Sequence, residues 1–260
     1  MLANRRHEII CSILRSEGAV TASRLVEEFN VSLETVRRDL LALEKAGLLH
    51  RVHGGAVSLG AMKPYRPPEI RQQDFSREKE LLCENAADLV QEGDYIAIGT
   101  GTTPVYFAQT LKKRFRKLTV VTYSFSVFEA LSDMPEYDLI LLGGQYMSEE
   151  QCFSGQLTQD ALRQLRVMKS FVFPSAISMD YGIFGYEQSL YPLQRQLLQC
   201  CDQAFILADS SKFERKALYK VDVMRPEYIY VTDPNLPEEL AQIYRDNGLQ
   251  VITGRSKCND

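Results

Sequence analysis

Two adjacent arginines, Arg37 and Arg38, stand in the stretch VSLETVRRDL and could bind DNA. The planar guanidinium fork of arginine matches both guanine edges and phosphate oxygens. If a helix begins at Ser32, its apolar Val36 and Leu40 face the core and the arginines face away from it. The N-terminal half of such a helix can enter a major groove. The side chains predicted to contact DNA from this helix are Ser32, Thr35, Arg37 and Arg38.

A glycine turn follows this helix and carries further basic side chains. Short apolar segments flank Gly54 and Gly55 in LLHRVHGGAV, which predicts a β-hairpin that bears Arg51 and His53. On such a wing these two side chains are expected to contact phosphates or the minor groove. The alternative for residues 37–39 is a solvated helix face, which isolated arginine pairs usually form.

Three helical patterns position these groups. Residues 4–16 place four apolar side chains on one stripe, and residues 21–29 begin at the N-cap Thr21. The third helix ends before Gly47, a residue type that commonly follows helices. Helix, helix, short turn, helix and hairpin predict a winged helix-turn-helix over residues 1–57. The alternative is a winged helix that binds protein instead of DNA.

The composition bounds the class of protein. Hydrophobic residues make up 45% of the chain and charged residues 25%, which is typical of a globular protein. No apolar run is long enough to span a bilayer and the N-terminus lacks the apolar core of a signal peptide. We therefore expect a cytoplasmic protein with no membrane partner. Six scattered cysteines without a C-x-x-C pair predict free thiols, no metal site and no cofactor.

Charge and proline content divide the chain. Residues 1–57 hold eight Lys and Arg against seven Asp and Glu, a net charge of +1, and the remaining residues hold 22 against 27, a net charge of −5. Residues 58–75 contain three prolines and show no apolar periodicity, so we predict a linker there. Residues 76–260 form the predicted second domain.

The second domain alternates helical and strand patterns. Strands are predicted in DYIAIG, LTVVT, YDLILLGG, SFVFPSAI, AFILAD, YIYVT and LQVIT, with helices between most of them. Such alternation predicts an α/β fold with a parallel sheet, in which ligands bind at the carboxyl ends of the strands.

Three stretches, IGTGTTP, LLGG and ILADSSKF, fall at predicted strand ends, and the first and the third could bind an anion. IGTGTTP suits a phosphate because its glycines let the backbone approach closely and its threonines stand at a helix N-terminus. ILADSSKF supplies a lysine, which can pair with a phosphate as a point charge. The alternatives are plain turns for IGTGTTP and LLGG, and a surface lysine in ILADSSKF. The residues predicted to bind the anion are Gly101, Thr102, Thr103, Asp209 and Lys212.

Both parts of the chain resemble the DeoR family of bacterial sugar-metabolism repressors. The first part matches V-S-x-x-T-[IV]-R-R-D-L and R-x-H-G-G-A, and the second shares G-T-T, G-G and D-S-S-K-F. The resemblance implies a sensor domain with the fold of ribose-5-phosphate isomerases and CoA transferases. It further implies a repressor that binds a double-stranded DNA operator and is released by a phosphorylated sugar or related metabolite. It also makes the predicted anion site an effector site and adds Ser124, Gly143, Gly144 and Arg195 to it.

The chain departs from the family pattern where sugar hydroxyls are expected to bind. Gly99 stands in place of an aspartate, Tyr123 in place of an asparagine, and Gln194 precedes Arg195 where the family favours a Lys-Arg pair. The phosphate elements are better kept than the sugar elements. We therefore expect looser sugar discrimination than is usual for the family.

The main alternative function is an enzyme with isomerase-like or CoA-transferase-like activity in residues 76–260. Proton abstraction needs a positioned carboxylate or histidine, and this part has no histidine. We therefore predict no catalysis. An activator, or a structural DNA-binding protein without an effector, is a further alternative. Because one short recognition helix reads too few base pairs for genomic specificity, we expect a homodimer or homotetramer.

Overall fold

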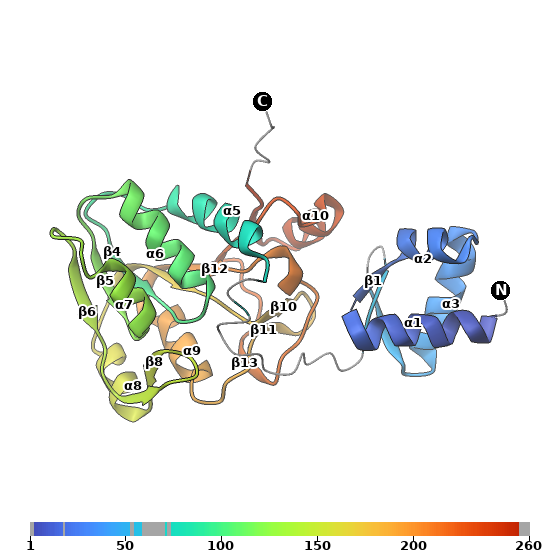
Figure 1. Cartoon of the computed structure of the whole chain (residues 1–260), viewed down its shortest axis with the longest axis horizontal. Helices are drawn as coiled ribbons and strands as arrows, with labels where there is room; N and C mark the ends of the chain where they lie inside the picture. Colours follow the sequence, from blue (N-terminus) through green and yellow to red (C-terminus); the bar gives the residue numbers. More distant parts are fainter. Residues whose placement is uncertain (1–2, 18, 53–54, 59–70, 72–73, 255–260) are drawn as a thin grey trace. The chain divides into compact units, whose positions relative to one another are not determined.

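The computed structural model describes residues 3–17, 19–52, 55–58, 71 and 74–254 (Figure 1). The chain forms two compact units that divide in the sequence near residue 64. His53, Gly54 and most of the predicted linker lie outside the described residues. Along these ranges no helix combines the length and the apolar character needed to cross a bilayer. The same ranges contain no group of three or more His, Cys, Asp or Glu placed to hold a metal ion.

The first unit contains three helices and a small antiparallel sheet. Its core is a single apolar cluster that includes Ile10 and Leu14 of the first helix, Leu25 of the second, and Val36 and Leu40 of the third. This core confirms the apolar stripes predicted for the three helices. The elements are α1 (Ala3–Glu17), β1 (Ala19–Thr21), α2 (Ala22–Phe29), α3 (Leu33–Lys45), β2 (Leu49–Val52) and β3 (Gly55–Ser58).

Side-chain caps fix where α2 and α3 begin. Thr21 Oγ1 accepts a hydrogen bond from the Arg24 amide at 3.3 Å, and Ser32 Oγ accepts one from the Thr35 amide at 3.2 Å. Gly47, with φ +68°, follows the end of α3 in the left-handed region that favours glycine. Both predicted N-caps and the predicted helix end are confirmed.

The predicted hairpin has a third strand that the sequence did not indicate. β3 pairs with β2 on one side and with β1 on the other, so the sheet order is β1-β3-β2. A Cβ atom at Gly55 would lie 2.1 Å from the Val20 carbonyl oxygen of β1. Glycine is therefore required at position 55 because a neighbouring strand passes so closely.

A seven-stranded sheet lies at the centre of the second unit, in the order β15-β14-β12-β9-β4-β5-β6. Its pairs are all parallel, which confirms the predicted α/β fold. The strands read as continuous apolar runs because both faces of the sheet are covered. They are β4 (Tyr95–Ile98), β5 (Thr119–Thr122), β6 (Asp138–Leu141), β9 (Val167–Val172), β12 (Cys201–Leu207), β14 (Ile229–Val231) and β15 (Gln250–Ile252).

Helices cover both faces of this sheet (Figure 1). Leu82, Phe107 and Leu131 bring the three helices from 76 to 131 into one apolar cluster, whereas Leu162 and Leu193 bring the next two into a second. The helices are α5 (Ser76–Ala87), α6 (Thr103–Arg114), α7 (Phe125–Leu131), α8 (Gln156–Arg163), α9 (Tyr191–Gln199) and α10 (Glu238–Asp246).

Short antiparallel segments complete the second unit. One pair forms a hairpin after β6, and three further strands form a separate small sheet. The hairpin, helix α8 and most of the small sheet were not predicted. These segments are β7 (Gln145–Met147), β8 (Cys152–Ser154), β10 (Ala176–Ser178), β11 (Gly182–Gly185), β13 (Tyr219–Asp222) and the 3-10 helix η1 (Ser210–Lys212).

Candidate DNA-binding helix and effector site

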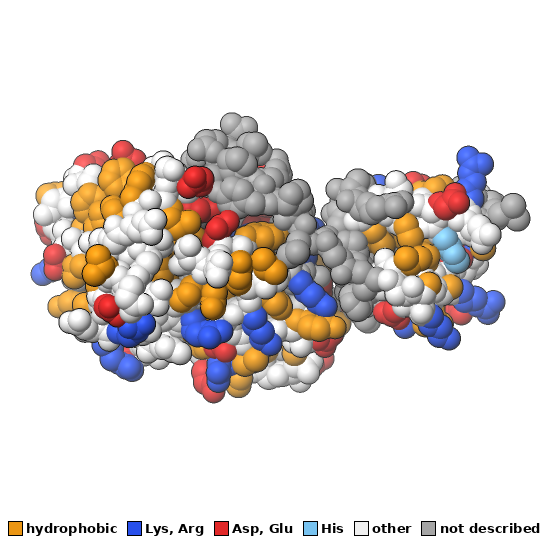
Figure 2. Space-filling model, turned by 90° about the horizontal axis from the view of Figure 1, so that it is seen from below, with side chains coloured by type: hydrophobic (Ala, Val, Ile, Leu, Met, Phe, Trp, Pro, Cys, Tyr) orange, Lys and Arg blue, Asp and Glu red, His pale blue; other side chains and the backbone are white. Residues whose placement is uncertain are grey.

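The exposed face of α3 carries the predicted DNA contacts. Arg37 and Arg38 are both exposed, and Ser32 and Thr35 stand at the N-terminus of the helix with their hydroxyl oxygens 2.9 Å apart. Arg38 Nε lies 3.5 Å from Glu34 Oε1, and because both side chains are well exposed this ion pair is weak. Lys and Arg side chains project from the smaller unit on the face that Figure 2 shows. The helix therefore presents two guanidinium groups that contact water in the free protein and can contact DNA instead.

The wing holds Arg51 against the end of α3. Arg51 Nε donates to Glu44 Oε2 at 2.7 Å, and the Arg51 amide donates to Glu44 Oε1 at 2.8 Å. One edge of this guanidinium is thus engaged within the unit, which fixes its direction. The role of Arg51 stays a prediction, and His53 lies outside the described residues.

Asp39, next to the arginine pair, is buried and does not belong to a solvated face. The Arg6 guanidinium donates to its carboxylate through Nε at 2.6 Å and Nη2 at 3.0 Å. His7 Nε2 lies 3.0 Å from Asp39 Oδ1. Although burial raises it, the hydrogen bonds from Arg6 and His7 hold the pKa of Asp39 below its usual value. The alternative of a solvated face is therefore wrong for Asp39, and α1 fixes α3 directly beside the DNA-facing residues.

In the second unit, the strand order reverses at β4, which has β5 on one side and β9 on the other. Ligands of parallel sheets bind at the carboxyl end of the strands at such a point. Gly101 follows β4 with φ +128°, a conformation that favours glycine. Thr102 is the N-cap of α6 but makes no side-chain capping bond, and Thr103 is buried. No side chain caps the start of α6, and since Pro104 has no N–H, the amides of Thr103 and Val105 are the ones that could bind an anion there.

The loop after β12 is fixed by two buried carboxylates. Asp209 accepts from the Ser211 amide at 3.2 Å and from the Ser211 hydroxyl at 2.5 Å. Asp233 accepts from the Ser210 amide at 2.6 Å and from its hydroxyl at 3.1 Å, and burial raises the pKa of Asp233. Lys212 Nζ lies 3.7 Å from Asp209 Oδ2 and its side chain is 22% exposed. Asp209 therefore positions Lys212, which is half-buried rather than a surface lysine.

Sequence reasoning missed Lys79, which belongs to this site. It lies on α5 in line with Leu82, Cys83 and Ala86, the spacing of a buried helical stripe, and it is 4% exposed. Its ammonium group donates to the Arg71 carbonyl oxygen. The sequence does contain a signal for Lys79, because it occupies a position in the apolar stripe of its helix where a lysine is unusual.

The ammonium groups of Lys79 and Lys212 lie close enough to repel each other. Burial and the nearby Lys212 ammonium lower the pKa of Lys79 to about 8. Cys83, one turn along α5, donates to the Thr103 carbonyl oxygen at 3.6 Å and so ties α5 to the start of α6. Two cationic groups thus gather beside a helix N-terminus without a side-chain cap. This arrangement suits a doubly charged anion such as a phosphate ester.

Two carboxylates and an arginine gather near Thr100, in the loop after β4. Arg71 Nη2 donates to Glu150 Oε1 at 2.6 Å, and the Thr100 hydroxyl donates to the Glu150 carbonyl oxygen at 3.4 Å. Burial, and then Glu150, raise the pKa of Glu187, whereas Arg71 lowers it. Carboxylates accept hydrogen bonds from hydroxyl groups, so this part of the site suits a polyhydroxy ligand.

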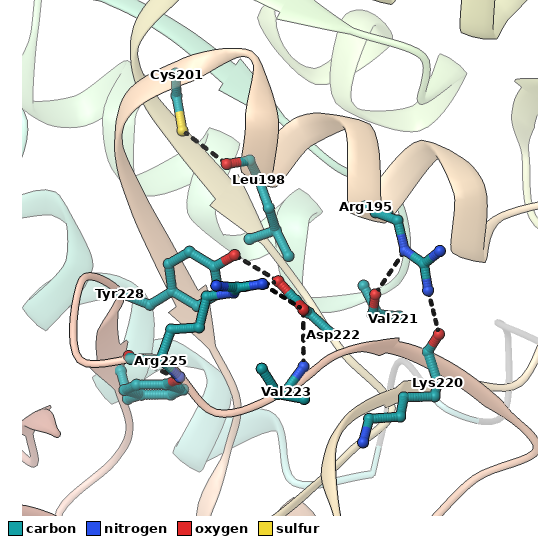
Figure 3. A network of polar contacts seen from close by, with 10 residues as sticks. Arg195, Leu198, Cys201, Lys220, Val221, Asp222, Val223, Arg225 and Tyr228 are labelled. Atoms are coloured by element: carbon teal, nitrogen blue, oxygen red, sulfur yellow. Dashed lines mark hydrogen bonds and ion pairs between the residues drawn. The ribbon is translucent and has the colours of Figure 1, made fainter.

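Arg195 makes its hydrogen bonds within the fold (Figure 3). Its Nε donates to the Val221 carbonyl oxygen at 2.9 Å and its Nη2 to the Lys220 carbonyl oxygen at 3.1 Å, which fixes α9 to β13. Its guanidinium also stands over the Tyr191 ring, 5.8 Å from the centroid. These contacts give Arg195 a structural part, and its effector role stays a prediction.

Three other predicted effector residues shape the same edge of the sheet. Ser124 is fully buried and caps α7, because its hydroxyl accepts from the Val127 amide at 3.4 Å. Gly143 accepts from the Thr158 hydroxyl at 2.9 Å, and a Cβ at Gly144 would lie 2.1 Å from that hydroxyl oxygen. The two glycines follow the edge strand β6, about 20 Å from β12 at the usual strand spacing. The structure therefore does not bring them to Lys212.

Comparison with known proteins gives two family matches and several relatives. Residues 6–61 match the DeoR-like helix-turn-helix domain, and residues 74–234 match the DeoR C terminal sensor domain. The chain is 37% identical over 217 residues to the lactose phosphotransferase system repressor of Lactococcus lactis subsp. lactis, covering 83% of this chain and 85% of that protein. It is 28% identical to the L-fucose operon activator of Haemophilus influenzae, covering 96% of this chain and 99% of that protein. Ribose 5-phosphate isomerase A of Methanocaldococcus jannaschii aligns with a TM-score of 0.40 and 18% identity, over 54% of this chain and 55% of that chain.

Proposed function

Because the chain belongs to the DeoR family of transcriptional regulators, we propose that it represses genes of sugar metabolism until a phosphorylated sugar binds its second unit. The observation that carries the sensing part is a buried lysine on α5, Lys79, whose pKa is lowered by burial and by Lys212, on a helix that the Cys83 thiol ties to the uncapped start of α6. The L. lactis relative is named as a repressor of the lactose phosphotransferase system, which supports both the repressor role and the link to sugar metabolism. The chain is a regulator and not an enzyme.

The DNA-binding surface of this proposal is the exposed face of α3 together with the wing. Arg37 and Arg38 read bases or phosphates in the major groove, and Ser32 and Thr35 set the register at the helix N-terminus. Arg51 and His53 contact the backbone from the wing. The exposure of both arginines and the caps at Ser32 support this assignment.

In this proposal one group of residues binds the phosphate of the effector, and a second group holds the surrounding loops and helices in place. The phosphate binds the backbone of Gly101, Thr102 and Thr103 and the ammonium groups of Lys79 and Lys212. Asp209 positions Lys212 through the 3.7 Å ion pair. Four further residues support the site: Ser124 caps α7, Gly143 and Gly144 pack against Thr158, and Arg195 holds α9 against β13.

We assign residues 1–57 to the DNA-binding domain, 58–75 to a linker, and 76–260 to a domain for sensing and oligomerisation. A homodimer or homotetramer supplies the repeated half-sites that one short helix cannot read alone. Sedimentation of the full chain tests the assembly, and a monomer at the concentrations that bind operator would count against it.

Effector binding releases the operator only if the effector distinguishes two arrangements of the DNA-binding domains. The test is operator release followed by fluorescence anisotropy, titrated with matched phosphorylated and unphosphorylated sugars. Release by a phosphorylated sugar alone supports the proposal. Equal release by the unphosphorylated sugar contradicts the phosphate site, and tighter operator binding with the effector contradicts the repressor assignment.

A further inference from the structure

Arg71 lies in the stretch of sequence that joins the two units, and the second unit holds it at two places. Its guanidinium donates through Nη2 to Glu150 Oε1 at 2.6 Å, and its main-chain carbonyl oxygen accepts a hydrogen bond from the Lys79 ammonium group. Residue 71 belongs to the linker predicted over residues 58–75. These two contacts therefore set the point at which the connection to the DNA-binding unit leaves the second unit.

The partner of the guanidinium is buried and fixed in place. The Glu150 side chain is 5% exposed, against 29% for Arg71. The Glu150 carbonyl oxygen accepts from the Thr100 hydroxyl at 3.4 Å, and the carbonyl oxygen of Gln151 accepts from the Phe125 amide at 2.8 Å. These bonds attach the turn between β7 and β8 to the loop after β4 and to the start of α7. Because a partly buried ion pair is screened less than an exposed one, Glu150 holds the Arg71 side chain firmly.

The partner of the main-chain carbonyl is the lysine that the proposed phosphate would contact. Lys79 is 4% exposed, and its ammonium lies 5.9 Å from the centroid of the Tyr106 ring. An ammonium group has three N–H donors, so Lys79 can donate to the Arg71 carbonyl and to a phosphate oxygen at the same time. Burial and Lys212 lower the pKa of Lys79 to about 8. A bound phosphate dianion raises that pKa again, and a charged ammonium donates a stronger hydrogen bond to the carbonyl.

The backbone at the start of α5 is strained. Phe75 precedes the helix with φ 54° and ψ 37°, a left-handed conformation that is unfavourable for a bulky residue. Its carbonyl oxygen accepts from the Lys79 amide at 3.0 Å, while the Lys79 side chain reaches the carbonyl of Arg71. Such strain persists only where the surrounding contacts hold it. The contact between Lys79 and Arg71 is one of those contacts, so its strength bears on the position of residue 71.

We propose that Arg71 couples effector binding to operator release: a phosphate bound at Lys79 strengthens the hold on the Arg71 carbonyl, and Glu150 holds the side chain of the same residue. This inference rests on the proposed function, which places the phosphate at Lys79 and Lys212. A ligand shifts an equilibrium only if it binds one arrangement better than the other. The effector favours the arrangement in which residue 71 is held at both places, and the operator favours the arrangement in which it is released. Two recognition helices must match the spacing of their half-sites, so the point at which each connection leaves its sensor domain affects operator affinity.

The test measures this coupling in the full-length protein. Fluorescence anisotropy gives the dissociation constant for operator without effector and with a saturating sugar phosphate, and the ratio of the two is the coupling factor. The probe is whichever of glucose 6-phosphate, fructose 6-phosphate, tagatose 6-phosphate and ribose 5-phosphate releases the wild type most effectively. Isothermal titration of that probe, with and without operator, should give the same factor, because coupling between two binding sites is reciprocal.

Arg71→Ala keeps the carbonyl that Lys79 binds but removes the contact with Glu150. Its coupling factor should therefore fall by about fivefold or more, toward one, since couplings between sites usually span roughly 5- to 150-fold. The variant should still bind the sugar phosphate in the titration without operator. Arg71→Lys retains the charge but not the guanidinium geometry, so it should recover part of the factor.

Glu150→Gln tests the same contact from the other end and removes the buried charge itself, so it carries the test if Arg71→Ala does not fold. Its coupling factor should also fall. The double variant Arg71→Ala, Glu150→Gln should lose no more than Arg71→Ala alone, because the two residues act through one contact. Arg77→Ala is the matched control, since Arg77 is a well-exposed arginine on α5 that pairs with Glu80 at 3.4 Å, and it should keep the wild-type factor.

A wild-type coupling factor in both Arg71→Ala and Glu150→Gln would overturn the inference and leave the proposed function standing. Loss of sugar phosphate binding in both variants would also overturn it, because the contact would then belong to ligand binding and not to the connection between the units. A wild type whose operator affinity changes with none of the four sugar phosphates overturns the proposed function and the inference together.

Discussion

The guanidinium of Arg6 and the carboxylate of Asp39 form a buried, two-point ion pair between α1 and α3, with Nε to Oδ2 at 2.6 Å and Nη2 to Oδ1 at 3.0 Å. Both side chains are less than a tenth exposed. Asp39 directly follows Arg38, so this pair fixes the rotation and the depth of α3 where it presents its arginines.

Asp39→Ala should lower both the unfolding temperature of the first unit and its operator affinity. The substitution takes the two-point carboxylate partner away from a buried guanidinium, which is strongly destabilising. The double variant Arg6→Met, Asp39→Leu should recover stability, since an apolar pair can replace a buried ion pair. Circular dichroism melts and anisotropy on the same samples measure the two effects. Full stability in Asp39→Ala would show that the pair does not support the helix.

The same pair makes stability depend on pH in the acidic range. The pKa of Asp39 is lower in the folded protein, so the unfolded chain binds its proton more readily as the pH falls. The stabilisation by Asp39 is therefore present above the unfolded pKa and is lost as the pH falls through the folded one.

Arg37→Ala and Arg38→Ala should each weaken operator binding by about 1–3 kcal/mol if the arginine reads a base. A phosphate contact would instead weaken binding on every sequence and reduce the salt dependence. Arg163→Ala is a suitable control, because Arg163 is a half-exposed arginine on α8 of the other unit. Anisotropy titrations at several salt concentrations separate the two roles, and wild-type binding by the double variant would refute the assignment of α3.

Lys212→Ala and Lys79→Met should give repressors that bind operator but resist release. Each loses a charged hydrogen bond to phosphate, so the effector concentration for release should rise about ten- to a hundredfold. The exposed Lys220 provides the control, and Lys220→Ala should be released like the wild type. A normal response in Lys79→Met would remove α5 from the site.

Phosphate ester binding should be tightest between about pH 6 and pH 8. Above pH 6 the ester carries its second negative charge. As the pH rises through about 8, Lys79 loses its proton in the free protein and the attraction falls. Without ligand the sign for stability is opposite: the unfolded chain holds the Lys79 proton up to its ordinary pKa of 10.5, so stability rises with pH above about 8. Titrations and melts from pH 6 to 9.5 check both trends, and Lys79→Met should abolish them.

The sequence predicted the helices that begin at a recognisable capping or turn residue. Thr21 and Ser32 cap their helices, and helix α6 begins at the predicted Thr103. The apolar strands that lie inside the parallel sheet were also recognised, because burial on both faces leaves a continuous apolar run. The three-residue strands β7, β8 and β10 are too short to show a period, and β1 consists of only three residues before a helix cap.

The candidate sites were only partly predictable for a different reason. Lys79 and Asp39 are charged residues at buried positions, and a charge in a helix is ordinarily read as solvated. Their partners lie far away in sequence: Arg6 is 33 residues from Asp39, and Lys212 comes from another strand loop. Only the fold brings such partners together, and for the same reason Arg195 proved to be braced against β13.

The alternation of exposed and buried residues along α3 sets how far a library can recode operator preference. Glu34, Arg37 and Arg38 can be randomised freely, because their side chains touch solvent rather than core. If position 39 is randomised as well, most variants lose the contact between Asp39 and Arg6 of α1. A change in DNA binding could then come either from altered base recognition or from a displaced helix. A screen for new operator sequences should therefore hold position 39 constant, so that each surviving clone reports on recognition alone.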